Sequence, residues 1–119
     1  MRHLESKLQR QVVKHIKEHY PHVLCFAVPN GGKRSKIEAA IMKGEGVLAG
    51  VSDLLFFWDD GTAYHKAAIE LKVGKNKESD PQKAFATKWC SLGGEYAVCR
   101  SLDDVIAALK AWRVPVRPI

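Results

Sequence analysis

The chain has 119 residues, of which 46% are hydrophobic and 27% charged, so we expect a single domain over residues 1–119 with a core of its own. Its apolar runs fall far short of the ~18 residues of a membrane span. The charged start MRHLESKLQR also lacks a secretory signal, so we expect a cytoplasmic protein with no membrane partner. The net charge of +6 reflects either an ordinary solvated surface or a polyanionic partner such as nucleic acid.

The first third of the chain predicts a helix, a strand and a shorter helix. An apolar residue at every fourth position predicts an amphipathic helix over residues 4–19, with Leu4, Leu8, Val12 and Ile16 as its stripe. The run VLCFAV predicts a strand over residues 23–28. SKIE predicts the next helix start, with Ser35 as the cap, and Gly44 ends that helix.

The rest of the chain predicts a hairpin and a second alternation of helix and strand. SDLLFFW and AYHKAAIELKV predict two antiparallel strands around the turn DDG. Asp80 is expected to cap a helix that begins with Pro81, EYAVCR predicts a strand, and SLDD starts a last helix. This order of elements predicts an α/β fold in which a mixed central sheet is flanked by helices.

The predicted hairpin carries charged residues where a core strand should be apolar. Side chains in a strand alternate, so Glu70 and Lys72 share one face and Leu71 takes the other. A turn near Asp60 places Asp53 opposite residues 67–69, and a bulge or the sheet twist would bring it beside Glu70. The alternative is a plain Glu70–Lys72 surface pair with Asp53 at a strand end.

Two neighbouring carboxylates repel each other, and this repulsion raises their affinity for protons. A divalent cation between them removes the conflict, and hard oxygen ligands select Mg²⁺, Mn²⁺ or Ca²⁺ over zinc. If the hairpin does bring Asp53 and Glu70 together, a metal site is therefore the chemistry that they favour.

The charged residues also form a pattern that resembles a known family. Asp53 and the segment ELK, with 16 residues between them, resemble the PD-(D/E)-x-K phosphodiesterase signature. GGKRSKIEAAIMKGEGVLAGVSDLLFF is similar to the first half of a VRR-NUC domain, and DPQKAFATKWCSLGGEYAVCRSLDDVI is similar to its end. The resemblance covers nearly the whole chain. One departure is Ser52, which stands where the family usually has proline.

The resemblance implies a restriction-endonuclease-like fold and a DNA nuclease that depends on Mg²⁺ or Mn²⁺. Asp53, Glu70 and the backbone carbonyl of Leu71 would hold the metal, and Lys72 would orient the attacking water or stabilise the developing charge. Small single-domain members, often from phages, resemble Holliday-junction resolvases. The resemblance therefore implies branched or junction DNA as the substrate and a homodimer, for which the last helix and the proline-containing tail offer apolar surface.

Further residues have open roles. Glu5 either contributes to the site, through a metal-bound water or by binding a second metal, or is a first-turn acid favoured by the helix dipole. Gln82 either bonds a metal-bound water or phosphate or is merely solvated. The expected DNA-contacting residues are basic and follow two loops, namely Lys33, Arg34, Lys36, Lys43 and Lys75. A DNA-binding module with an inactive nuclease site is the competing hypothesis, and the intact Asp53, Glu70 and Lys72 favour the enzyme.

Overall fold

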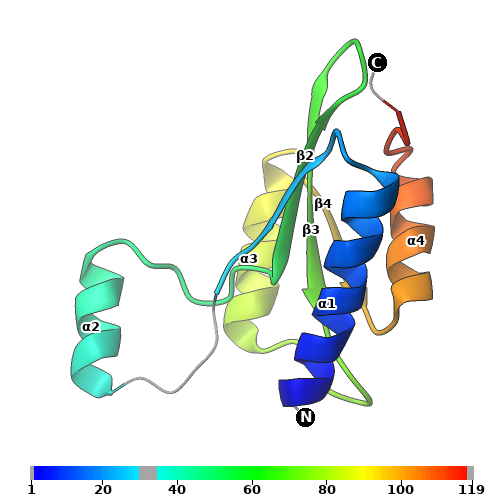
Figure 1. The fold of residues 1–119 in the computed structure, drawn as a ribbon. Helices are drawn as coiled ribbons and strands as arrows, with labels where there is room; N and C mark the ends of the chain where they lie inside the picture. Colours follow the sequence, from blue (N-terminus) through cyan, green and yellow to red (C-terminus); the bar gives the residue numbers. More distant parts are fainter. Residues whose placement is uncertain (1, 30–34, 118–119) are drawn as a thin grey trace.

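The computed structural model describes residues 2–29 and 35–117. Its elements in chain order are α1 (Arg2–His19), β1 (Leu24–Ala27), α2 (Lys36–Gly44), β2 (Leu54–Asp59), β3 (Tyr64–Leu71), α3 (Asp80–Ser91), β4 (Glu95–Cys99) and α4 (Leu102–Ala111). The described strands form one sheet in the order β1-β2-β3-β4, antiparallel except for the parallel pair β3 and β4. The predicted order of elements and the mixed sheet flanked by helices are confirmed (Figure 1).

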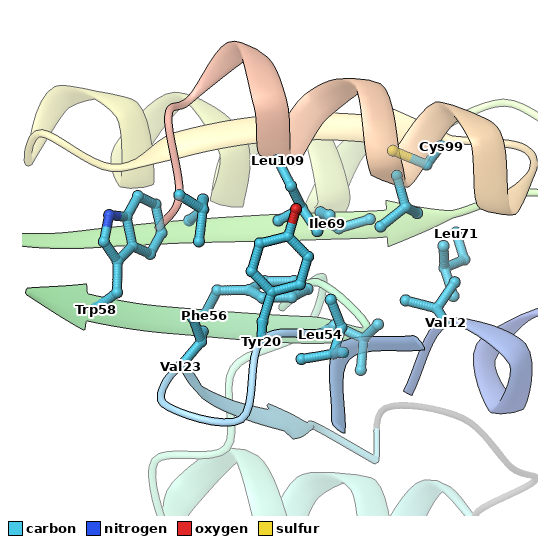
Figure 2. Packing of buried hydrophobic residues seen from close by; sticks show 14 of the residues in the cluster. Val12, Tyr20, Val23, Leu54, Phe56, Trp58, Ile69, Leu71, Cys99 and Leu109 are labelled. Atoms are coloured by element: carbon cyan, nitrogen blue, oxygen red, sulfur yellow. The ribbon is translucent and has the colours of Figure 1, made fainter. Parts of the chain in front are cut away.

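The hydrophobic core lies between one face of the sheet and helices α1 and α4 (Figure 2). The largest fully buried side chains there are Phe56, Leu54, Ile69, Leu71, Leu109, Val12 and Val105. The repeat of four in α1 predicts this packing, because residues four apart share one side of a helix. The apolar stripe of α4 is also buried in this core, so the last helix does not offer the bare surface that the sequence suggests for pairing.

The opposite face of the sheet carries the charged residues of the hairpin and is covered by α3. Leu54 pairs with Ile69, so the register places Asp53 directly opposite Glu70. The prediction that Asp53 lies opposite residues 67–69 and needs a bulge is therefore wrong. The Asp60 carboxylate accepts hydrogen bonds from the backbone N–H groups of Thr62 and Ala63, so the loop extends over residues 60–63 and is longer than DDG.

Helix α3 begins one residue earlier than predicted, with Ser79 rather than Asp80 as its cap. The Ser79 hydroxyl accepts a hydrogen bond from the Gln82 N–H, and the Gln82 Oε1 atom accepts one from the Ser79 N–H at 2.8 Å. This reciprocal pair is a capping box, and it fixes the Gln82 side chain at the start of the helix. Gly50 lies so close to this helix start, with φ of 86°, that a β-carbon there would come within 2.3 Å of the Pro81 backbone.

Helix α2 stands apart from the rest of the molecule (Figure 1). None of its residues is buried, although Ser35 caps it as predicted, by accepting a hydrogen bond from the Glu38 N–H. Within the described part of the chain, every helix is too short or too polar to span a membrane.

Candidate active site

Glu70 is the buried carboxylate of the charged face, with 3% of its surface exposed. Its Oε2 atom accepts a hydrogen bond of 3.1 Å from the Gln82 Nε2 atom and lies 3.9 Å from the Lys72 Nζ atom. Its Oε1 atom is buried, and no described residue donates a hydrogen bond to it. Because an unpaired buried charge is costly, this oxygen is the open position of the site.

The carboxyl group of Glu70 holds its proton more tightly than an ordinary glutamate does. Burial raises the pKa of Glu70 to about 8, and the negative charge of Asp53 beside it is the second cause. The two carboxyl groups are close enough to share a hydrogen bond when one of them is protonated. The Lys72 ammonium acts against this shift, and Glu5 adds to it. A cation would replace the proton and relieve the same conflict.

Asp53 lies directly before β2 and faces Glu70, and a backbone N–H group at the end of β3 fixes the position of its side chain. Its Oδ2 atom accepts a hydrogen bond of 2.7 Å from the Leu71 N–H. The N–H and C=O groups of one strand residue point to the same side of the strand, so the Leu71 carbonyl also lies on the Asp53 side. The structure thus brings together the two carboxylates and the carbonyl that the sequence predicts.

Gln82 donates a hydrogen bond directly to Glu70. Neither role considered from the sequence, a bond to a metal-bound water or phosphate or a solvated side chain, includes this contact. The capping box holds the Oε1 end of its amide, which leaves the Nε2 end to donate to Glu70. Gln82 therefore fixes the position of one Glu70 oxygen and leaves the other free.

Glu5 lies on α1 near the site, but it is not part of the carboxylate pair. Its charge is the last of the causes that raise the pKa of Glu70. Among the described residues, no group of three histidine, cysteine, aspartate or glutamate side chains is arranged to hold a metal ion. A role for Glu5 through an intervening water stays a prediction, and direct coordination beside Asp53 and Glu70 has no support in the geometry.

Of the predicted DNA-contacting residues, the structure describes Lys36, Lys43 and Lys75, and it shows none of these in contact with the carboxylates. Lys33 and Arg34 lie outside the described residues. Lys36 and Lys43 are exposed on α2, the helix that stands apart, and Lys75 is exposed in the loop after β3. Their contact with DNA stays a prediction.

The sequence-based interpretation assigns no role to two residues near the site, Glu78 and Tyr96. The Tyr96 hydroxyl donates a hydrogen bond of 2.6 Å to the Glu78 Oε2 atom. Burial, followed by this bond and the charges of Glu78, Glu70 and Asp53, raises the pKa of Tyr96 above its usual range. The contact ties β4 to the loop that leads into α3. No local sequence signal indicates this hydrogen bond, because Tyr96 and Glu78 are 18 residues apart. In contrast, the pattern S-x-x-Q would have identified Ser79 as the cap of α3.

The residues of the site fit a hard divalent cation. Asp53 and Glu70 form the carboxylate pair, Glu5 lies nearby, and the Lys72 ammonium lies 3.9 Å from Glu70. The site is therefore negative when its acids are ionised, although the chain as a whole carries +6. The orphaned Glu70 Oε1 atom, the adjacent Asp53 carboxylate and the Leu71 carbonyl are all oxygen donors, as Mg²⁺ and Mn²⁺ prefer.

Comparison with known proteins agrees with the geometry. The family model of the VRR-NUC domain matches residues 4–103, which is most of the chain and includes every carboxylate of the site. The chain belongs to the VRR-NUC domain family. No curated protein matches the sequence of this VRR-NUC domain. The VRR-NUC family is a family of nucleases, so the chain carries a nuclease domain with DNA as its class of substrate.

A solved structure also shares the VRR-NUC fold. It is named "VRR_NUC domain protein", superposes with a TM-score of 0.70 and is 24% identical in sequence. The match covers 96% of this chain and 90% of that chain. At this identity the likeness establishes the fold and nothing finer.

Ser52, which replaces the usual proline of the VRR-NUC pattern, is fully buried, and no described residue bonds its hydroxyl. We expect Ser52→Ala to stabilise the protein by about 1 kcal/mol, because it removes a polar group whose loss of water is not compensated. The melting temperature should rise by about 4 °C. As the matched control, Ser101→Ala should lower stability by about 1 kcal/mol, since that hydroxyl caps α4 by accepting from the Asp104 N–H. A less stable Ser52→Ala protein would show that the hydroxyl has a partner.

Proposed function

We propose that the protein is a DNA endonuclease that uses Mg²⁺ or Mn²⁺ to hydrolyse phosphodiester bonds. The observation that carries the proposal is the buried Glu70 Oε1 atom, which lacks a hydrogen-bond partner among the described residues and belongs to a carboxyl group that faces Asp53. When both carboxyl groups are ionised, that oxygen has no donor in the described part of the chain, whereas Gln82 pairs its neighbour, so either a shared proton or a bound cation must satisfy it.

Each residue of the site has a distinct part in this proposal. Asp53, Glu70 and the Leu71 carbonyl would hold the cation, which when bound polarises the phosphate and lowers the pKa of a coordinated water. Gln82 keeps the Glu70 carboxylate in position. The Lys72 ammonium, next to Glu70 and 12% exposed, is placed to orient the attacking water and to stabilise negative charge on the phosphate.

The proposed substrate is branched DNA, such as a four-way junction, and the proposed active form is a homodimer. The described residues of each chain hold one buried carboxylate pair of this kind, and cutting two strands of a junction therefore takes two chains. The net charge of +6 supports binding to phosphate backbones in general, and Lys33, Arg34, Lys36, Lys43 and Lys75 are the proposed contacts.

A second candidate function is a DNA-binding module whose nuclease site does not work. The observation in its favour is Ser52 in the place of proline directly before Asp53. Against it, the Leu71 N–H holds Asp53 and the Gln82 amide holds Glu70, so both carboxylates keep defined positions.

Cleavage assays on labelled four-way junction, flap and linear duplex DNA distinguish the two functions. We expect cleavage with Mg²⁺ and with Mn²⁺, fastest on the junction, and none in a chelator. Ca²⁺ should support binding with little cleavage, because its looser coordination positions the water poorly. Binding without cleavage in every metal would favour the inactive module, and cleavage in the chelator would contradict the metal-dependent mechanism.

A further inference from the structure

The loop after β3 connects the two parts of the site. It spans residues 72–79 and runs from the end of β3, which carries Glu70, to the start of α3, which carries Gln82. The middle of this loop is exposed, but Glu78 near its end is half-buried. Glu78 directly precedes Ser79, the cap of α3. The position of the end of the loop therefore determines where Gln82 meets Glu70.

The strand β4 and the residue after it hold this loop at two points. The Arg100 Nη1 atom donates a hydrogen bond of 2.9 Å to the Gly74 carbonyl, near the start of the loop. The Tyr96 hydroxyl donates one of 2.6 Å to the Glu78 Oε2 atom, near its end. Each bond has one charged partner when Glu78 is ionised, and such bonds are stronger than neutral ones. The loop is therefore tied to β4 on both sides of its exposed middle.

Tyr96 lies on the face of the sheet that carries the carboxylates. In the parallel pair of β3 and β4, Val98 lies beside Glu70, and Tyr96 precedes Val98 by two residues. Residues two apart in a strand point to the same face, as do neighbours on paired strands. Burial is the largest cause that raises the pKa of Tyr96, and the charges of Glu70 and Asp53 are among the others. The phenol therefore keeps its proton and remains a hydrogen-bond donor.

The bond from Tyr96 reaches the site through one rigid peptide unit. The peptide group between Glu78 and Ser79 is planar, so the Ser79 N–H moves with the backbone of Glu78. That N–H donates to the Gln82 Oε1 atom at 2.8 Å, and the other end of the same amide donates to Glu70 at 3.1 Å. A displacement of Glu78 therefore passes to the Glu70 carboxylate through two hydrogen bonds.

We propose that Tyr96 and Glu78 are positioning residues of the site, whose hydrogen bond fixes the start of α3 so that Gln82 holds Glu70 in the orientation that binds the metal. The inference rests on the proposed function for its metal, but the contact exists in the metal-free protein and can be measured there. Removal of a group that bonds a metal ligand commonly lowers metal affinity by about ten- to a hundredfold. Gln82 is such a group, and Tyr96 acts through it.

Nuclear magnetic resonance of the Gln82 side-chain amide in the metal-free protein tests the positioning. The signal is identified as the one that Gln82→Ala lacks. We expect Tyr96→Phe to move it toward the position of a solvated glutamine amide, because the amide loses its fixed partners. Glu78→Gln retains an oxygen that can accept from Tyr96 and should keep the wild-type signal. Tyr64→Phe, which removes the hydroxyl of an 89% exposed tyrosine, is the matched control and should also keep it.

Calorimetric titration with Mn²⁺ measures the consequence for metal binding. We expect Gln82→Ala to weaken Mn²⁺ binding by about tenfold or more and Tyr96→Phe to weaken it by roughly fivefold. The double variant should bind as Gln82→Ala alone does, because residues that act as one unit are not additive. In cleavage assays, Tyr96→Phe should lower kcat and leave KM for DNA nearly unchanged, since the proposed DNA contacts stay intact.

Three results would overturn the proposal: an unchanged Gln82 signal in Tyr96→Phe, additive losses of Mn²⁺ affinity in the double variant, or a Glu78→Gln protein that behaves as Tyr96→Phe does. Circular dichroism establishes that each variant folds, and Glu78→Ala removes the same bond from the loop side and should reproduce the Tyr96→Phe results. A wild type that binds no Mn²⁺ refutes the proposed function, and the amide signals then still decide whether Tyr96 positions Gln82.

Discussion

Asp53→Ala and Glu70→Ala should each lower DNA cleavage by about a thousandfold or more, because a catalytic cation contributes several kcal/mol to the transition state. Neither change should unfold the protein, since each removes one partner of a like-charge pair along with a metal ligand. The measurements are gel cleavage assays and calorimetric titration with Mn²⁺ on the same preparations. Both variants should lose heat of Mn²⁺ binding.

Lys72→Ala should separate metal binding from catalysis. An ammonium is not a metal ligand, so this variant should stop cleavage and keep most of its Mn²⁺ affinity above pH 8. Lys14, a 78% exposed lysine on α1, provides the control, and Lys14→Ala should cleave as the wild type does. If Asp53→Ala still binds Mn²⁺ and still cleaves, the two carboxylates do not form the site, and the nuclease mechanism proposed for this hairpin is wrong.

Glu70→Gln should make the metal-free protein more stable at pH 8. The folded protein keeps the Glu70 proton up to a pKa of about 8, whereas the unfolded chain loses it near 4.5. Between these values the folded state binds more protons, so the unfolding free energy of the wild type falls as pH rises, by up to about 1.4 kcal/mol per unit. Glutamine does not titrate, so the variant lacks this loss and should gain on the order of a few kcal/mol at pH 8.

Urea denaturation of both proteins in a chelator, at several pH values between 5 and 8, measures this difference. Glu95→Gln, at an exposed glutamate on β4, is the control and should keep the pH dependence of the wild type. Mn²⁺ at pH 8 should stabilise the wild type and leave Glu70→Gln unchanged. Equal slopes for the wild type and Glu70→Gln would show that Glu70 ionises normally in the folded protein.

The elements of the fold follow from local signals in the sequence. The repeat of four in α1, the alternation in β2 and β3, and the serine before α2 each act over a few residues, and the structure confirms the elements that they predict. The faces of Glu70 and Lys72 follow from the same alternation. All of these signals act over a few neighbouring residues. They determine where helices and strands form, whereas contacts between distant segments determine how those helices and strands pack together.

One error lies in local turn chemistry, and the others arise where contacts between residues far apart in the sequence determine the structure. The register of the hairpin depends on the Asp60 carboxylate, whose bonds within the loop lengthen the turn and place Asp53 opposite Glu70. The contact between Gln82 and Glu70 depends on how α3 lies over the sheet, which no local pattern encodes. The sequence of α2 likewise does not predict that this helix lies apart from the sheet and the other helices. An apolar helix has the same sequence pattern whether it packs within its own chain or against another molecule.

The topology of the sheet also orders the events of folding. Residues 60–63 alone connect β2 and β3, whereas β4 reaches β3 only after residues 72–94. Pairings between nearby segments form before distant ones, because closing a short loop costs less chain entropy. We infer that Asp53 and Glu70 meet early, while water still surrounds them, and that their desolvation waits until Gln82 and β4 arrive. Stopped-flow kinetics of Gln82→Ala check this order, since the change should speed unfolding and leave the folding rate nearly the same.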